Sequence, residues 1–152
     1  MGYLNEATGI VENFVINMQE PIYGANNLFA VLRYNRGTIQ NGYIYGKNIE
    51  AIYPLAEGQT RYAAIQSQNN YVKGISRNIY TLASVNVLEQ EGVTNNVANI
   101  VSTIAVDCKI QNIYSVGIGN KTNFNQGPNA ITTASNREEN CYYFSEEVFP
   151  NS

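Results

Sequence analysis

The segment from residue 99 to 116, NIVSTIAVDCKIQNIYSV, alternates between apolar and polar side chains along most of its length. Successive side chains of a strand point to opposite faces, so an alternation with a period of two predicts a strand with one buried face. The segment is long for a single strand, and we expect a bend or a bulge within it. The even positions are mostly apolar, namely Ile100, Ile104, Val106, Cys108, Ile110, Tyr114 and Val116.

Shorter segments with β character fill the rest of the chain, near 28–34, 38–45, 49–53, 61–67, 71–76 and 78–89. Turn residues separate them at intervals of about eight to twelve residues, which is typical of sandwiches and barrels. The composition agrees, because the 12 Tyr favour pleated surfaces and the many Asn and Gly favour turns. The sequence therefore predicts an all-β, single-domain sandwich or barrel over 1–152, and a jelly roll is among the arrangements that fit.

The two ends of the chain differ in character from the middle. One short helix is expected at 6–19, where Ile10, Phe14 and Met18 share a helical face, although Gly9 weakens it. No internal repeat is apparent, and 119–136 is expected to be a long loop. Residues 1–27 and 138–152 are candidate extended arms.

The stretch NRGTIQNGYIYGKN, residues 35–48, is rich in glycine and asparagine. A phosphate-binding loop of the Walker type would need two glycines separated by four residues, the second followed by Lys and then Ser or Thr. Here three residues separate Gly42 from Gly46-Lys47, and Asn48 takes the place of the hydroxyl residue. Turn chemistry explains the stretch better: 35–37 is expected to be a hairpin loop with Gly37 left-handed, and 46–48 another turn. At Asn41-Gly42 we expect a bulge rather than a second hairpin turn.

Residues able to carry out catalysis are scarce. The chain has no His, which removes the commonest general base and metal ligand, and Asp107 is its one aspartate. Cys108 falls on the apolar face of its segment, where a thiol stays protonated. We therefore expect no enzymatic activity, no cofactor and no metal site. Cys108 and Cys141 are either two thiols or a disulfide between neighbouring strands.

Neutral polar and aromatic side chains dominate instead. Charged residues make up 14% of the chain, whereas Asn and Gln number 23 and 8. Tyr43, Tyr45, Tyr53, Tyr62, Tyr71 and Tyr80 could form a stacking platform for sugars, but tyrosines also concentrate in subunit interfaces. Candidate interface or binding residues are Tyr43, Tyr45, Tyr53, Tyr62, Tyr142, Tyr143, Phe144 and Phe149.

The charges are distributed unevenly along the chain. Residues 1–32 and 138–152 contain acidic residues but no Lys or Arg, whereas all nine basic residues lie in 33–137. An acidic arm could therefore dock on the basic body of a neighbouring copy. The basic residues form no cluster, so nucleic acid is not an expected partner. No apolar run approaches the length of a membrane span, and no secretory signal is visible.

These observations favour a non-enzymatic structural protein, made in the cytoplasm, that functions in a virion or another extracellular assembly. A capsid-decoration, connector or tail component of a phage-type virion fits this description, with strand and arm exchange as the mode of self-assembly. The expected partners are further copies of the chain, as a homo-oligomer, and other structural proteins of the assembly. The alternative is a lectin-like β module that binds glycans through a surface of Tyr and Asn.

Overall fold

Every regular element in the described part of the chain is a β-strand. The computed structural model describes residues 2–70, 73–104, 107–116 and 138–143. Its strands form four sheets, which we call A to D, and every strand pairing within them is parallel. The all-β prediction is thus confirmed.

The strands of the four sheets follow one another in a fixed order. Sheet A contains β1 (Gly2–Asn5), β5 (Leu32–Asn35), β9 (Ser67–Asn70) and β13 (Val101–Ile104). Sheet B contains β2 (Ile10–Met18), β6 (Thr38–Gly46), β10 (Ile75–Thr81), β14 (Lys109–Ser115), β15 (Glu138–Glu139) and β16 (Tyr142–Tyr143). Sheet C contains β3 (Ile22–Tyr23), β7 (Ile49–Ala51) and β11 (Val85–Val87). Sheet D contains β4 (Leu28–Phe29), β8 (Thr60–Ala64) and β12 (Thr94–Ala98).

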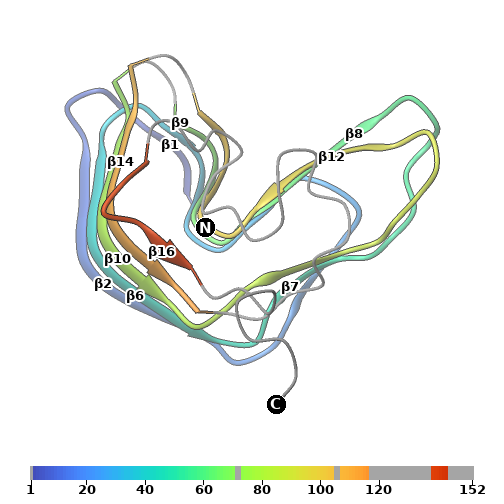
Figure 1. Ribbon diagram of the computed structural model, residues 1–152, viewed down its shortest axis with the longest axis horizontal. Coiled ribbons are helices and arrows are strands. Elements are labelled where there is room, and N and C mark those ends of the chain that lie inside the picture. The colour runs from blue at the N-terminus through green and yellow to red at the C-terminus, as the bar shows by residue number, and fades with distance from the viewer. Residues whose placement is uncertain (1, 71–72, 105–106, 117–137, 144–152) are drawn as a thin grey trace.

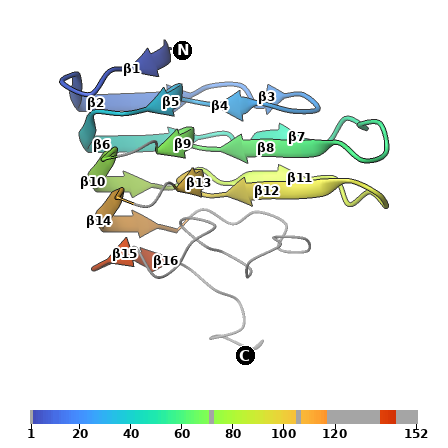
Figure 2. The ribbon, with the colours of Figure 1, turned by 90° about the horizontal axis from the view of Figure 1, so that it is seen from above.

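The chain contributes one strand to each of sheets A, B, C and D in turn. It then repeats this order, and each new strand lies beside the strand of the preceding round in the same sheet. It therefore winds as a parallel β-solenoid, in which each coil contacts mainly the coils before and after it. The first coil is β1–β4, the second β5–β8 and the third β9–β12; β13 and β14 belong to the fourth, and β15 and β16 to the fifth. Figure 2 shows these coils stacked in order. Seen along the stack, each coil is bent, with sheets A and B in one arm and sheets C and D in a long, narrow second arm (Figure 1).

The prediction of a sandwich, barrel or jelly roll is wrong. Those folds are built mainly from antiparallel strands, whereas here every pairing is parallel and the hydrogen-bonded neighbour lies a full coil later in the sequence. The hairpin expected at 35–37 is wrong for the same reason, because β5 and β6 lie in different sheets. The single long strand expected over residues 99–116 is wrong, because this segment holds two strands, β13 and β14, which again lie in different sheets.

The helix expected at 6–19 is also wrong, because residues 10–18 form strand β2. Ile10 and Val15 turn outward, whereas Val11 and Ile16 turn toward the core, which is the alternation of a strand. The full-length parallel partner β6 gives the backbone of this segment its hydrogen bonds, and this pairing overrides the helical spacing of its apolar residues.

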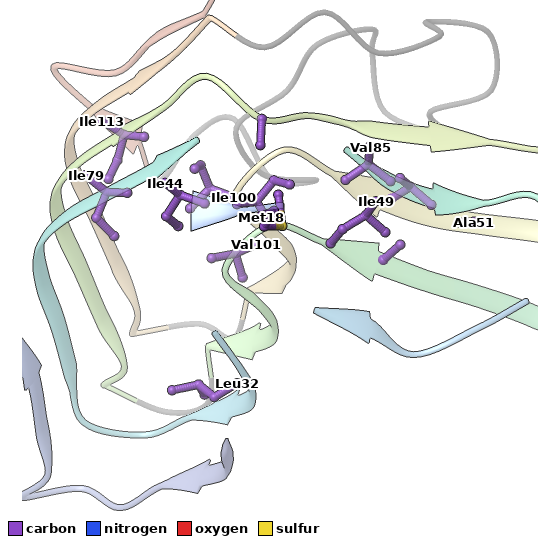
Figure 3. Close-up of a cluster of buried hydrophobic side chains, with 14 of the residues drawn as sticks. Met18, Leu32, Ile44, Ile49, Ala51, Ile79, Val85, Ile100, Val101 and Ile113 are labelled. Atoms are coloured by element: carbon purple, nitrogen blue, oxygen red, sulfur yellow. The ribbon is translucent and has the colours of Figure 1, made fainter. Parts of the chain in front are cut away.

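The interior of the coils is filled mainly with branched aliphatic side chains. Positions in register on successive coils place like residues above one another, as Ile79 does over Ile113. Figure 3 shows the cluster where the two arms of each coil meet, with Ile44, Ile49 and Val85 among its members. Stacking of this kind buries apolar surface that no single coil could cover alone.

A buried arginine holds the narrow arm together. The side chain of Arg61 on β8 is fully buried, and burial lowers the pKa of its guanidinium. Its Nε donates to the Ala25 carbonyl oxygen at 2.9 Å, its Nη2 to that of Tyr53 at 2.9 Å and its Nη1 to that of Leu88 at 2.6 Å. These three acceptors belong to three successive coils. Arg61 therefore ties the coils to one another through main-chain carbonyls.

Candidate binding and assembly surface

An asparagine occupies the same position on the outer side of sheet B in every coil, and we call this set the Asn column. The column consists of Asn13, Asn41, Asn78, Asn112 and Asn140, whose φ angles are 54°, 54°, 53°, 52° and 51°. All five lie in the left-handed region, which asparagine tolerates better than other residues with a side chain. The register of paired residues omits the first four of these asparagines, although the residues on either side of each one are paired. Each of these strands therefore turns a corner at its asparagine, and the corners of neighbouring strands lie above one another. The irregularity expected at Asn41-Gly42 is thus present, but every strand of the sheet has it, so it is not a bulge in one strand.

The side chains of the Asn column form a continuous chain of hydrogen bonds. Nδ2 of each asparagine donates to Oδ1 of the asparagine in the preceding coil, at 3.2, 3.0, 3.0 and 3.2 Å along the column. The column therefore has a direction, with amide donors turned toward the first coil and carbonyl acceptors turned toward the last.

Replacing Asn78 in the middle of this column separates its two contributions. Asn78→Ala should lower the free energy of unfolding by about 2 kcal/mol, because it loses both side-chain hydrogen bonds and keeps a Cβ at a left-handed φ, which alanine tolerates less well than asparagine. Asn78→Gly loses the same bonds without the steric cost and should lose about 1 kcal/mol. Urea unfolding measures both values. Equal losses for the two variants would show that the left-handed backbone contributes nothing.

A second column, of charged and amide side chains, runs beside the Asn column. It contains Glu12, Gln40, Arg77, Gln111 and Glu139, which lie in register on β2, β6, β10, β14 and β15. Gln40 donates to Glu12, Arg77 donates to Gln40 at 2.7 Å, and Gln111 donates to Glu139 at 2.7 Å. The column therefore ends in a carboxylate on each side. Each carboxylate accepts its hydrogen bond from a glutamine in the neighbouring coil, Glu12 from Gln40 and Glu139 from Gln111.

A third column on the same face consists of aromatic side chains and starts at Val15, which lies in register with Tyr43. Tyr43 stacks on Tyr80 with ring centroids 5.5 Å apart, Tyr80 contacts Tyr114 at 6.5 Å, and Tyr114 stacks on Tyr142 at 5.1 Å. We call Val15, Tyr43, Tyr80, Tyr114 and Tyr142 the aromatic column. A further ring, Tyr45, stacks on Tyr43 at 5.0 Å.

The stacking of these rings decides what the aromatic column can bind. Where two rings stack, at interplanar angles of 26° and 21°, each covers a face of the other. A pyranose ring binds an aromatic side chain through that same face. The ring faces turned toward each other within these two stacked pairs are therefore not open to a sugar, whereas Tyr80 and Tyr114 meet at 56° and are not stacked.

The structure brings together only some of the residues expected to bind. Tyr43 and Tyr142 both belong to the aromatic column and Tyr45 stacks on Tyr43, whereas Tyr53 lies exposed in the narrow arm and Tyr62 is half-buried on β8. Tyr143 is the last residue of β16. Phe144, Phe149 and Tyr71 lie outside the described residues.

Sequence reasoning missed Tyr114 as a surface residue and missed the Asn column altogether. The signal is a motif of four residues. Its first position is Glu, Gln or Arg, its second is Asn, its third varies, and its fourth is Val or Tyr. It occurs as ENFV, QNGY, RNIY, QNIY and ENCY, starting at residues 12, 40, 77, 111 and 139. Corresponding asparagines are 28, 37, 34 and 28 residues apart, so the turns between strands vary in length and hide the period. The statement that the chain has no internal repeat is therefore wrong.

The groups considered for catalysis are dispersed. Cys108 is buried and Cys141 half-buried, and both are thiols rather than partners in a disulfide. Among the described residues, no three His, Cys, Asp or Glu side chains stand close enough to hold a metal ion. Within the same ranges there is no helix of the length and hydrophobicity that a membrane crossing needs.

The comparisons with known proteins add no relative. No family model, curated protein or solved structure matches the chain.

Proposed function

We propose that this chain is a non-enzymatic structural protein that assembles with further copies of itself, as a capsid-decoration, connector or tail component of a virion does. The observation that carries the proposal is the edge of sheet B. Strand β2 is nine residues long and pairs only with β6 in the described structure, so one side of its backbone is open to another strand.

The surface around this edge supports the same function. Natural proteins protect an edge strand with a bulge, a proline, a short length or a high density of charge. Strand β2, IVENFVINM, has one charged residue, Glu12, and no proline. The low charge content of the whole chain, 14%, also suits a protein that packs closely against copies of itself.

Light scattering coupled to size exclusion tests the proposal on the 152-residue chain. We expect the mean mass to rise above the 16.9 kDa of one chain as the protein concentration increases, because assembly follows mass action. A mass that stays at one chain at every concentration would overturn the proposed function.

The second candidate is a lectin-like function, which the amides beside the aromatic column favour. The stacked ring faces argue against it, since sugars bind those faces. We expect a panel of saccharides to leave the melting temperature unchanged, whereas a lectin gains stability with its ligand. A rise that saturates with one saccharide would favour the lectin over the assembly protein.

A further inference from the structure

The first coil presents three features of sheet B that point away from the stack. The carbonyl oxygen of Met18 accepts a hydrogen bond from Lys47 in the second coil, so the alternation of the strand between the Asn13 corner and Met18 turns the peptide N–H of Val15 away from that coil. The Val15 side chain is 67% exposed. Oδ1 of Asn13 accepts from Asn41, while its Nδ2 has no acceptor among the described residues.

The fifth coil presents the complementary features at the opposite edge of sheet B (Figure 2). Nδ2 of Asn140 donates to Asn112, and no described group donates to Oδ1 of Asn140. The side chain of Tyr142 is 57% exposed, compared with 41% for Tyr80 and 48% for Tyr114 inside the aromatic column. The last ring of the column therefore has the least cover.

These features distinguish between two ways in which two copies could meet. If two first coils met, the Nδ2 donors of two Asn13 side chains would face each other without an acceptor. If the fifth coil of one copy met the first coil of the next, Asn13 Nδ2 would donate to Asn140 Oδ1, as the amides do within the column. Tyr142 would then lie in line with Val15, as Tyr43 lies in register with Val15 within one copy.

We infer that copies of this chain stack head to tail, with the fifth coil of one copy against β2 of the next, so that the Asn column and the aromatic column continue across the junction. A head-to-tail contact joins two different ends of the molecule, so a pair of copies still has one free first coil and one free fifth coil. Further copies can add at both, which produces an open-ended filament rather than a closed dimer. The occupant of the β2 edge is thus a second copy of the chain. This inference rests on the proposed function and specifies its interface.

One feature opposes the junction and provides a test of its geometry. The second column of sheet B, which consists of charged and amide side chains, ends in Glu12 on β2 and in Glu139 on β15. Head-to-tail stacking of two copies therefore brings these two carboxylates to neighbouring positions. Glu12→Gln removes this repulsion and supplies an amide donor, and it should strengthen assembly. Glu20→Gln makes the same change at an exposed residue outside β2 and should have no effect.

Two further variants test the hydrogen bonds of the junction. Asn13→Asp keeps the acceptor for Asn41 but replaces the outward donor with a carboxylate, and Val15→Pro removes the outward N–H. Each should weaken assembly by about tenfold or more, measured by sedimentation over a concentration series. The control for the charge is Asn96→Asp, which adds the same charge on β12. Val15→Thr changes the same side chain but keeps the N–H, and it should weaken assembly less than Val15→Pro does. Circular dichroism and melting temperature verify that the variants fold.

The outcomes separate the interface from the function. Weakened assembly for Asn13→Asp and Val15→Pro, with Asn96→Asp like wild type and Val15→Thr weakened less than Val15→Pro, supports the head-to-tail junction. Assembly unchanged by both variants overturns the junction but leaves an assembling protein. Assembly that stops at dimers overturns the head-to-tail direction. A wild-type chain that stays monomeric overturns the junction together with the proposed function.

Discussion

Replacing Arg61 with lysine should lower the free energy of unfolding by about 3 kcal/mol or more. The guanidinium donates to three main-chain carbonyl oxygens in three coils, and a lysine ammonium on a differently shaped stem cannot reach all three. Each buried carbonyl left without a donor costs about 1–3 kcal/mol. Urea unfolding of Arg61→Lys, followed by circular dichroism, gives the value directly.

The control makes the same chemical change at a surface position. Arg77 is exposed on β10, where its Nε donates to Gln40, so Arg77→Lys should cost no more than about 0.5 kcal/mol. If the two lysine variants were equally stable, the buried guanidinium would not be what ties the coils of the narrow arm together.

The second large effect is expected at Gly46, the last residue of β6. Its φ is +104°, and a Cβ built there would lie 2.3 Å from the Met18 carbonyl oxygen, which accepts a hydrogen bond from Lys47. Gly46→Ala therefore combines an unfavourable backbone conformation with a clash against main-chain atoms. We expect a loss of about 3 kcal/mol in the free energy of unfolding.

Gly58 provides a matched control in the narrow arm. Its φ is +79°, but a Cβ there would meet nothing within 4 Å. Gly58→Ala should therefore lose only the conformational part, about 1 kcal/mol. Equal losses at the two glycines would contradict the close approach of β6 to the Met18 carbonyl.

Some of this architecture could be predicted from local sequence. The alternation over 100–116 identified β14 and placed its residues correctly before the corner at Asn112, where Ile110 is buried and Lys109 exposed. Beyond that corner the prediction is wrong, because the left-handed residue inverts the alternation, so that Tyr114 is exposed and Ser115 is buried. That alternation depends only on which face of a strand is buried, so it is legible without knowing the neighbouring strand. The Asn corners could also have been found, because ENFV, QNGY, RNIY, QNIY and ENCY repeat in the printed sequence.

The partner of each strand could not be predicted in this way. Hairpin and solenoid strands have the same alternation and the same turn residues, so β5 and β6 look like a hairpin although they lie in different sheets. Residues 10–18 match a helical spacing as well as a strand, and only the parallel partner β6 selects the strand.

The candidate surface shows the same division between sequence and structure. The abundance of tyrosine and amide indicated a surface that binds, and Tyr43, Tyr45 and Tyr142 do share one face of sheet B. Only the stacking of coils shows that the tyrosine rings cover one another and that the amides of the Asn column point in one direction. The sequence by itself determined that the strands are amphipathic and where the chain turns, because those properties depend on neighbouring residues. The tertiary structure decided the pairing, because hydrogen bonds between residues some 30 positions apart depend on the length of each coil.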